Sequence, residues 1–297
     1  MRLVQLKDRT MKDLLPDRTE EGNKGTFGKI SLFAGSLNMA GAAILSCEAA
    51  LRMGCGMARV VTPSANRVIV QERIPEALLT TYEEGTEKKA AEEALDFADA
   101  AVIGPGLSRS KSAGTLLENV LTLAPGRIRG LVIDADAVRL LSEDPALMHL
   151  LDTAAEKMTV ILTPHAAECA ALLHRSVDRL KETRPACLKE FADSHHVTIL
   201  CKDHVSLCVT AGSDLVYENL EGTSALAKAG TGDVLTGMCV SILVQWQKSG
   251  QIPDLPLGLF CAGAASTLHA RAARVLTVNG NERSLLAGDL KFAFDRL

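Results

Sequence analysis

One segment of the sequence places two glycines and a carboxylate at the start of an expected helix. Residues 229–233 read Ala-Gly-Thr-Gly-Asp, and apolar residues at helical spacing then predict a helix over 233–248. The first turn of a helix has free N–H groups and the positive end of the helix dipole. Because Gly230 and Gly232 carry no side chains that would block these groups, the sequence predicts an anion site with Asp233 beside it.

Asp233 is an unusual neighbour for an anion, because a carboxylate repels phosphate. It suits a base that takes a proton from a hydroxyl attacking phosphorus, while the N–H groups at Gly230 and Gly232 stabilise the moving phosphoryl group. The alternative is purely structural, since aspartate is favoured near helix N-termini on electrostatic grounds alone. We expect Asp233, Gly230 and Gly232 to be catalytic.

Other unusual residues directly follow expected strands, where ligands bind in open α/β sheets. Lys202 ends a buried strand, so its ammonium needs an anionic partner, and a phosphate would satisfy it. The alternative is a lysine that reaches solvent past the sheet edge. Gly104-Pro105-Gly106 is either an ordinary tight turn or a place where a ligand approaches bare backbone. His165 either caps a helix or binds a substrate, and we expect substrate contact.

The elements that must position these residues alternate between strand and helix, which indicates a mostly parallel sheet covered on both faces. We find no linker or repeat and expect one domain over 1–297. Strands are expected at 29–34, 58–62, 100–103, 131–134, 159–162 and 197–201, and two short runs at 206–210 and 215–218 are expected to form a hairpin or the edge of the sheet. Helices are expected at 38–53, 87–98, 113–123, 135–141, 145–155, 166–174, 184–194, 233–248, 257–278 and 284–296.

Composition excludes several classes of function. Aromatic residues make up 3% of the 297 residues and the net charge is −4, so neither stacking nor a basic patch indicates a nucleic-acid partner. No charge-free apolar stretch approaches the roughly 18 residues of a membrane span, and the first 20 residues lack the apolar region of a signal peptide. The eight cysteines form no C-x-x-C pair. We expect them to be reduced core residues of a soluble, cytoplasmic protein.

Taken together, the motifs resemble those of the ADP-dependent NAD(P)H-hydrate dehydratases, a family of the ribokinase-like superfamily. The segment 229–233 resembles the anion hole and catalytic aspartate of the superfamily, and narrower matches follow the order of the family from about residue 24 to residue 237. Two stretches depart from the family pattern, at 222–228 and at Asp203, where the family has glycine. The narrower matches are KGTFG at 24–28, AGS at 34–36, MAGAA at 39–43, GPGL at 104–107, DADA at 134–137, LTPH at 162–165 with Glu168, and KDHVS at 202–206.

The resemblance implies a fold, a reaction and a site. The fold would be a three-layer α/β/α sandwich. In the reaction, ADP would phosphorylate the hydrate of NADH or NADPH, and phosphate would leave to restore NAD(P)H, with Mg²⁺ as cofactor through ligands that the sequence does not identify. The resemblance further implies a homo-oligomer such as a tetramer, without the epimerase domain that often precedes this one. The hydrate would contact Ala42, Gly106, His165 and Asp233, and the nucleotide would contact Lys202, Asp203, His204, Val205, Ser206 and Gly232.

Two other functions fit part of the pattern. A ribokinase-like kinase for a hydroxymethylpyrimidine or thiazole alcohol would share the anion hole and Asp233 but would stop at a stable phosphate ester. The opening motifs at 24–28 and 39–43 argue against it. A regulatory protein that binds nucleotide without turnover would not need Asp233 as a base.

Overall fold

The computed structural model describes residues 1–278 and 280–297. Its strands are β1 (Arg2–Val4), β2 (Lys29–Phe33), β3 (Met57–Pro63), β4 (Leu78–Tyr82), β5 (Ala100–Ile103), β6 (Gly130–Ile133), β7 (Thr159–Leu162), β8 (Thr198–Cys201), β9 (Ser206–Thr210) and β10 (Leu215–Asn219). Its helices are α1 (Met11–Leu14), α2 (Ala40–Arg52), α3 (Arg67–Arg73), α4 (Glu87–Phe97), α5 (Lys111–Leu123), α6 (Ala135–Glu143), α7 (Pro145–Ala155), α8 (Ala166–Leu172), α9 (Val177–His195), α10 (Thr231–Ser249) and α11 (Leu257–Leu276), with 3₁₀ turns η1 (Ser64–Asn66), η2 (Ser224–Leu226) and η3 (Ala287–Arg296).

The strands form one sheet in the order β1-β10-β9-β8-β7-β6-β5-β2-β3-β4. The strands from β8 through β7, β6, β5, β2 and β3 to β4 pair in parallel, and β9 runs antiparallel to both β8 and β10. The central strands β5 and β6 are buried along their whole length because helices cover both faces. The predicted α/β class with a mostly parallel sheet is confirmed, and the two short runs expected to form a hairpin or a sheet edge form the antiparallel hairpin β9–β10.

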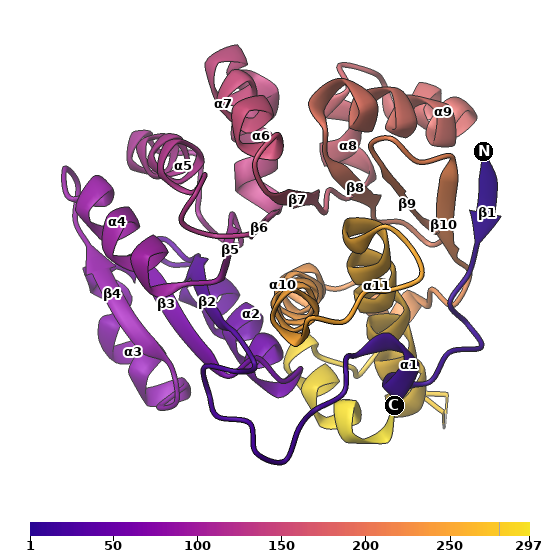
Figure 1. Cartoon of the computed structure of the whole chain (residues 1–297), viewed down its shortest axis with the longest axis horizontal. Helices are drawn as coiled ribbons and strands as arrows, with labels where there is room; N and C mark the ends of the chain where they lie inside the picture. Colours follow the sequence, from indigo (N-terminus) through magenta and orange to yellow (C-terminus); the bar gives the residue numbers. More distant parts are fainter. Residues whose placement is uncertain (279) are drawn as a thin grey trace.

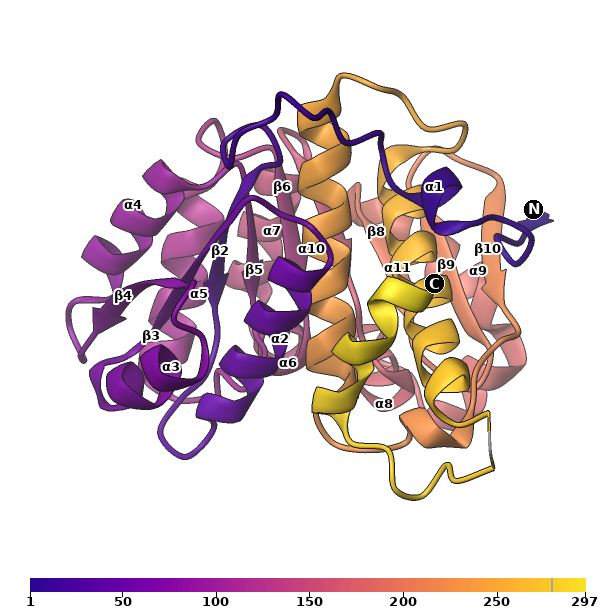
Figure 2. The same cartoon turned by 90° about the horizontal axis from the view of Figure 1, so that it is seen from below.

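Helices lie on both faces of the sheet, which gives three layers (Figure 1). The helices α4 to α9 cover one face, and α2, α3, α10, α11 and η3 cover the other. Figure 2 shows α10 standing between α2 and α11, and α10 packs on both of them. Almost every residue of α10 between 234 and 246 is buried, so its position is fixed from all sides.

The structure adds elements that the sequence did not predict and changes others. The strands β1 and β4 and the helices α1 and α3 were not expected, and the C-terminal helix expected at 284–296 is a 3₁₀ turn, η3. The helix α9 begins at Val177, before the expected start at residue 184, but its backbone leaves helical geometry at Thr183, two residues before Pro185. The predicted start therefore coincides with a kink between two helical segments.

Two further observations concern the whole chain. All eight cysteines are buried and free, as expected for core cysteines. Within the described residues, no helix joins the length and the apolar composition needed to cross a membrane.

Candidate active site

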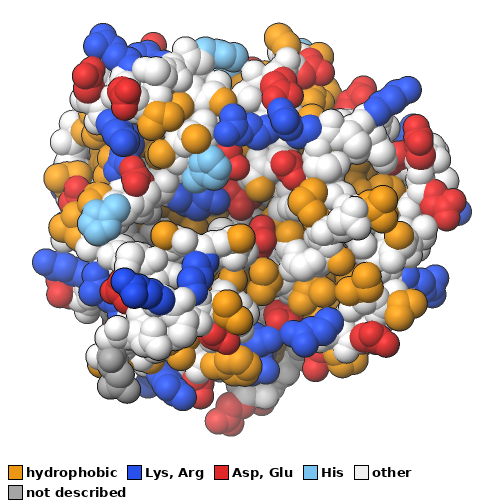
Figure 3. All heavy atoms as spheres, turned by 180° about the vertical axis from the view of Figure 1, so that it is seen from behind, with side chains coloured by type: hydrophobic (Ala, Val, Ile, Leu, Met, Phe, Trp, Pro, Cys, Tyr) orange, Lys and Arg blue, Asp and Glu red, His pale blue; other side chains and the backbone are white. Residues whose placement is uncertain are grey.

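The loops that follow five neighbouring parallel strands meet at the carboxyl ends of these strands. The strands β2, β5, β6, β7 and β8 are adjacent in the sheet and point the same way, so their carboxyl ends lie side by side. Figure 3 views the molecule from this side, where α10 also begins, and shows acidic and basic side chains around a hollow near the centre. The predicted gathering of the special strand-end residues is therefore confirmed.

The start of α10 has the open backbone that an anion requires. Gly230 takes a left-handed conformation, with a φ of 90°, and a β-carbon there would lie 2.6 Å from Leu45 Cδ1. The hydroxyl of Thr231 donates to the carbonyl oxygens of Leu226 (2.8 Å) and Lys228 (2.9 Å), which closes the turn. Within the described part of the chain, the N–H groups of Gly232 and Asp233 have no protein acceptor. Two donors at the positive end of a long helix are thus available to a ligand.

Lys202 reaches from the end of β8 to this helix start. Its Nζ atom would lie 3.3 Å from a β-carbon placed on Gly232, so the ammonium borders the open backbone. The same Nζ donates to Asp134 Oδ1 at 2.7 Å, and Thr236 Oγ1 donates to Asp134 Oδ2 at 2.6 Å. Asp134 follows β6 and is 1% exposed. Its carboxylate therefore fixes Lys202 and the first turns of α10 against each other.

The Asp134–Lys202 pair revises one expectation drawn from the sequence. A phosphate was expected as the anionic partner of Lys202, but the buried carboxylate of Asp134 fills that role in the protein itself. The ammonium keeps further N–H donors beyond the one used by Asp134, so phosphate binding by Lys202 stays a prediction. Asp134 and Thr236 were not predicted as site residues, although Asp134 belongs to one of the motifs that follow strands.

The surroundings of Asp233 raise the pKa of its carboxyl group into the range of a general base. Burial raises the pKa of Asp233 to about 7, with the charge of Asp134 adding to the rise and that of Lys202 opposing it. Burial alone would lower the pKa of Lys202, but the charges of Asp134, Glu168 and Asp233 outweigh it and raise that pKa. The lysine therefore stays charged, and Asp233 titrates near neutral pH, as a general base does.

His165 and Glu168 form the cap of α8 at the rim of the site. The His165 Nδ1 atom accepts from the N–H groups of Ala167 (3.1 Å) and Glu168 (3.3 Å), and Glu168 Oε2 accepts from the His165 N–H at 2.9 Å. Burial would raise the pKa of Glu168, but hydrogen bonding from His165 and the charge of Lys202 hold it below its usual value. The capping role that the sequence left open for His165 is present. Its ring is half exposed, so contact with a substrate stays a prediction.

The two small residues predicted to contact the hydrate lie next to each other. A β-carbon on Gly106 would lie 2.7 Å from Ala42 Cβ, and Gly106 takes a φ of 59°. The loop after β5 is joined to the loop after β2, because the Gly35 N–H donates to the Pro105 carbonyl at 2.8 Å. Ala42 and Gly106 thus form one wall with little side-chain bulk, which fits the close approach of a flat ligand.

The predicted nucleotide loop, 202–206, is held from two sides. Asp203 accepts from Arg184 Nη1 at 2.8 Å, and Arg184 also donates to the Val205 carbonyl. Ser206 Oγ donates to the Asp203 carbonyl at 3.1 Å, and the backbone at Gly222 lies against the His204 carbonyl. Of the loop residues, Lys202 reaches the start of α10, while Asp203 and His204 lie at the surface. Nucleotide contact by the loop residues beyond Lys202 stays a prediction.

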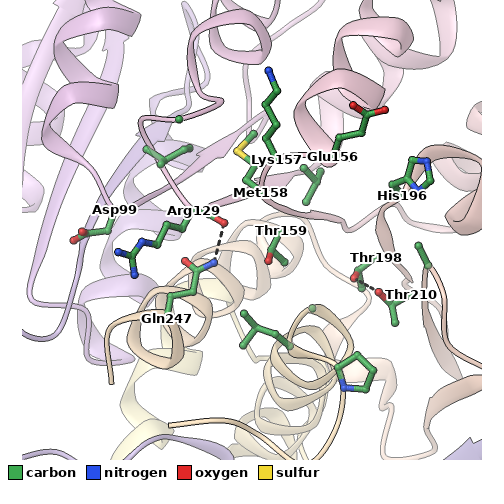
Figure 4. Close-up of a pocket in the computed structure, with 18 of the residues that line it drawn as sticks. Asp99, Arg129, Glu156, Lys157, Met158, Thr159, His196, Thr198, Thr210 and Gln247 are labelled. Carbon is green, nitrogen blue, oxygen red and sulfur yellow. Dashed lines mark hydrogen bonds between the residues drawn. The ribbon is translucent and has the colours of Figure 1, made fainter. Parts of the chain in front are cut away.

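A pocket of about 960 Å³ lies at the other end of the strands, away from this site (Figure 4). It is lined by residues at the amino ends of β6, β7 and β8, among them Arg129, Thr159 and Thr198. Thr198 and Thr210 hydrogen bond to each other at 2.8 Å, and Gln247 donates to the Arg129 carbonyl at 2.9 Å. None of the predicted catalytic residues lines this pocket, and ligands of open α/β sheets bind at the carboxyl ends of the strands. We therefore place the active site at the start of α10.

Comparison with known proteins identifies the family of the chain. The family model described as NAD(P)H-hydrate dehydratase matches residues 30–292. The chain belongs to the NAD(P)H-hydrate dehydratase family. It is 33% identical over 283 residues to the ADP-dependent (S)-NAD(P)H-hydrate dehydratase of Neisseria meningitidis, across 92% of this chain and 86% of that protein. Against the bifunctional NAD(P)H-hydrate repair enzyme of Vibrio cholerae it is 30% identical, and the alignment covers 97% of this chain but 53% of that one.

Solved structures of similar proteins show the same fold as this chain. The ADP/ATP-dependent NAD(P)H-hydrate dehydratase of Bacillus subtilis, co-crystallized with ATP and Mg²⁺, superposes with a TM-score of 0.78 and 29% identity over 97% of this chain and 95% of that one. A ribokinase-like superfamily protein of Enterococcus faecalis superposes with a TM-score of 0.80 and 24% identity, covering 99% of this chain and 94% of that one. The predicted ribokinase-like fold is confirmed.

Proposed function

We propose that this protein dehydrates the (6S)-hydrates of NADH and NADPH back to NADH and NADPH, with ADP as the phosphoryl donor and AMP and phosphate as products. The observation that carries the proposal is the start of α10. There, two N–H groups without an acceptor among the described residues, the Lys202 ammonium and a carboxylate with a pKa of about 7 lie together. The family membership and the names of the relatives support the substrate.

The proposed reaction has two steps. Asp233 removes the proton of the hydroxyl on the hydrated nicotinamide ring, and the hydroxyl oxygen attacks the β-phosphorus of ADP, whose bond to the AMP oxygen breaks. The N–H groups of Gly232 and Asp233 and the ammonium of Lys202 stabilise the charge on the moving phosphoryl group. Phosphate then leaves with the electron pair of its C–O bond. A proton is lost from the neighbouring carbon, and the ring double bond re-forms with electron donation from the ring nitrogen.

We propose two substrate sites at the carboxyl ends of the strands. We place the nicotinamide hydrate against Ala42 and Gly106, where neither residue carries a large side chain, with His165 at the rim. We place the nucleotide between the loop 202–206 and Gly232, because Lys202 joins these two segments. Asp203, His204, Val205 and Ser206 are included as loop residues that are held in place by Arg184 and Gly222.

Magnesium fits this site as an ion bound mainly by the nucleotide. Among the described residues, no three His, Cys, Asp or Glu side chains come together as a cage for a metal. The negative charges of several carboxylates already raise the pKa of Asp233. Bound ADP would add more negative charge, which a divalent cation would offset. Mg²⁺ usually keeps water ligands and binds phosphates with one or two carboxylates. Asp136 and Glu168 are the carboxylates near Asp233 that we propose for this role.

Four further properties stay predictions. The single sheet supports one domain over residues 1–297, and family resemblance supports a homo-oligomer such as a tetramer. The buried, free cysteines fit the reducing environment of the cytoplasm. We predict no nucleic-acid or membrane partner.

Product analysis separates the proposed reaction from that of a kinase. The purified protein is incubated with ADP, Mg²⁺ and NADH hydrate, and both NADH absorbance and inorganic phosphate are followed. A dehydratase regenerates NADH and releases one phosphate for each NADH. A stable phosphate ester without NADH would instead establish a kinase, and an unchanged hydrate would exclude the proposal.

A further inference from the structure

Gly222 lies where two loops of the proposed active site touch each other. One is the loop 202–206, which follows β8, and the other is the segment 220–230, which runs from β10 to the start of α10. A β-carbon placed on Gly222 would overlap the carbonyl oxygen of His204 and would lie 3.1 Å from its carbonyl carbon. Because these are backbone atoms, they cannot turn aside as a flexible side chain would. Only glycine therefore allows the two loops to lie this close together.

The chain at this contact is fixed by Arg274 of α11. The Arg274 Nε atom donates to the Glu221 carbonyl oxygen at 2.7 Å, and Nη2 donates to the Gly222 carbonyl oxygen at 3.2 Å. One planar guanidinium thus holds two consecutive carbonyl groups. Asn219 adds a second attachment to α11, because its Nδ2 atom donates to the carbonyl oxygen and to Oγ of Ser266, both at 2.9 Å. The backbone at the contact is therefore held by a long helix of the core.

The same segment continues directly to the start of α10. The 3₁₀ turn η2 is capped by Thr223, whose Oγ1 accepts from the Ala225 N–H at 3.3 Å. Thr231, the first residue of α10, donates its hydroxyl to the Leu226 carbonyl oxygen at 2.8 Å, which ties η2 to the helix. The contact at Gly222 is therefore joined through η2 to the start of α10.

We propose that Gly222, supported by Arg274, is a positioning residue for the nucleotide. Asp134 fixes Lys202 against the first turns of α10, so the phosphate end of the proposed nucleotide site is held without Gly222. The backbone contact at Gly222 then sets how far the remainder of the loop 202–206 lies from α10. This inference rests on the proposed function, because it assumes that ADP lies between this loop and the start of α10.

The substitution G222A tests this role, with KM measured separately for ADP and for NADH hydrate. The added methyl group would push the two loops apart, so we expect KM for ADP to rise about tenfold. KM for NADH hydrate should stay within about twofold, because the wall formed by Ala42 and Gly106 belongs to the loops after β2 and β5. At saturating ADP, kcat should also stay within about twofold, because Lys202 keeps its hydrogen bond to Asp134.

A second pair of variants removes the support without adding bulk. R274A deletes both donors to the backbone, and we expect KM for ADP to rise about threefold, as for the loss of exposed hydrogen bonds. R274K keeps one cationic donor within reach of the same carbonyl groups and should restore most of the affinity. A loss of stability alone would not change the ratio of the two KM values.

Two matched controls lie outside the site. A β-carbon on Gly114 of α5 would meet no atom within 4 Å, so G114A adds the same methyl group without a collision. Arg127 pairs with Asp96 at 2.7 Å, so R127A removes an arginine contact that does not involve either loop. We expect neither control to change the KM for ADP or for NADH hydrate.

The outcomes separate this inference from the proposed function. An unchanged KM for ADP in G222A, or equal rises in both KM values, would overturn the inference while a wild type that converts the hydrate upholds the function. A wild type that binds ADP but does not convert NADH hydrate contradicts the proposed function, and calorimetry of ADP with G222A then decides the inference by the same tenfold loss. If G222A does not fold, R274A and R274K decide it by the ratio of the two KM values.

Discussion

Replacing Asp233 by Asn should stabilise the protein while it removes activity. The pKa of Asp233 is about 7, against an ordinary value of 3.8, because its charged form is buried near other carboxylates. The difference of about 3 pKa units (7 − 3.8) corresponds to about 4 kcal/mol. In the folded state this is a cost of ionising Asp233, and Asn cannot ionise.

The sign of the effect depends on pH. Below about pH 4 the aspartate is protonated in both the folded and the unfolded states, so it contributes no difference. Between about pH 4 and pH 7 the unfolded chain releases the proton while the folded protein keeps it, so the free energy of unfolding falls as pH rises. The stability advantage of D233N should therefore grow by about 2.5 kcal/mol between pH 5 and pH 8.

Urea unfolding of both proteins at pH 5 and pH 8 measures this growth. The same substitution at Asp134 is the matched control, because Asp134 is 1% exposed and pairs with Lys202. D134N leaves a buried ammonium without its partner and should lower the free energy of unfolding by about 3 kcal/mol. The reasoning is refuted if D233N is less stable than the wild type at pH 8, or if its advantage is the same at both pH values.

Three further predictions concern activity. In the wild type, kcat/KM should rise about tenfold per pH unit below pH 7 and level off above it, because Asp233 must lose its proton to act as a base; a pH profile measures this. G232A should lose roughly 10²-fold or more in kcat, because a β-carbon 3.3 Å from Lys202 Nζ would occupy the phosphate site; a kcat equal to that of the wild type would contradict this role. The variant should fold normally, and a circular dichroism spectrum unlike that of the wild type would contradict that expectation. R184A should raise KM for ADP about tenfold and leave kcat unchanged, because Arg184 holds Asp203 and Val205 of the loop 202–206; steady-state kinetics would show otherwise if kcat alone fell.

The local features of the site could be predicted from the sequence because their signals are short-range. The glycines at 230 and 232, Asp233 and the helix behind them lie within one segment, and helical spacing and glycine position are read directly. The strand-end position of Lys202 and Asp134 followed from the alternation of strands and helices. These signals could not predict which of the residues at the strand ends lie close to one another across the sheet.

The pairing of Lys202 with Asp134 joins residues that are 68 positions apart and on strands separated by β7. Which of several strand-end carboxylates meets the ammonium depends on strand order and register, which the sequence alone does not determine.

The elements that were missed are short or lie at the sheet edges. β1 and β4 are the two edge strands, and β1 has three residues whose side chains are mostly exposed, so no alternation could be detected. β1 forms its sheet contacts with β10, more than two hundred positions away in the sequence. At the C-terminus, helical spacing predicted an α-helix, whereas the chain adopts the tighter 3₁₀ form against α2 and α11.

The most direct test of the account is the turnover of NADH hydrate by D233N, measured beside its affinity for ADP. We predict that D233N binds ADP as the wild type does and regenerates NADH about 10²- to 10⁴-fold more slowly, because the hydroxyl no longer has a base. Regeneration of NADH by D233N at the wild-type rate would contradict the assignment of Asp233 as the base and, with it, the proposed role of the α10 start.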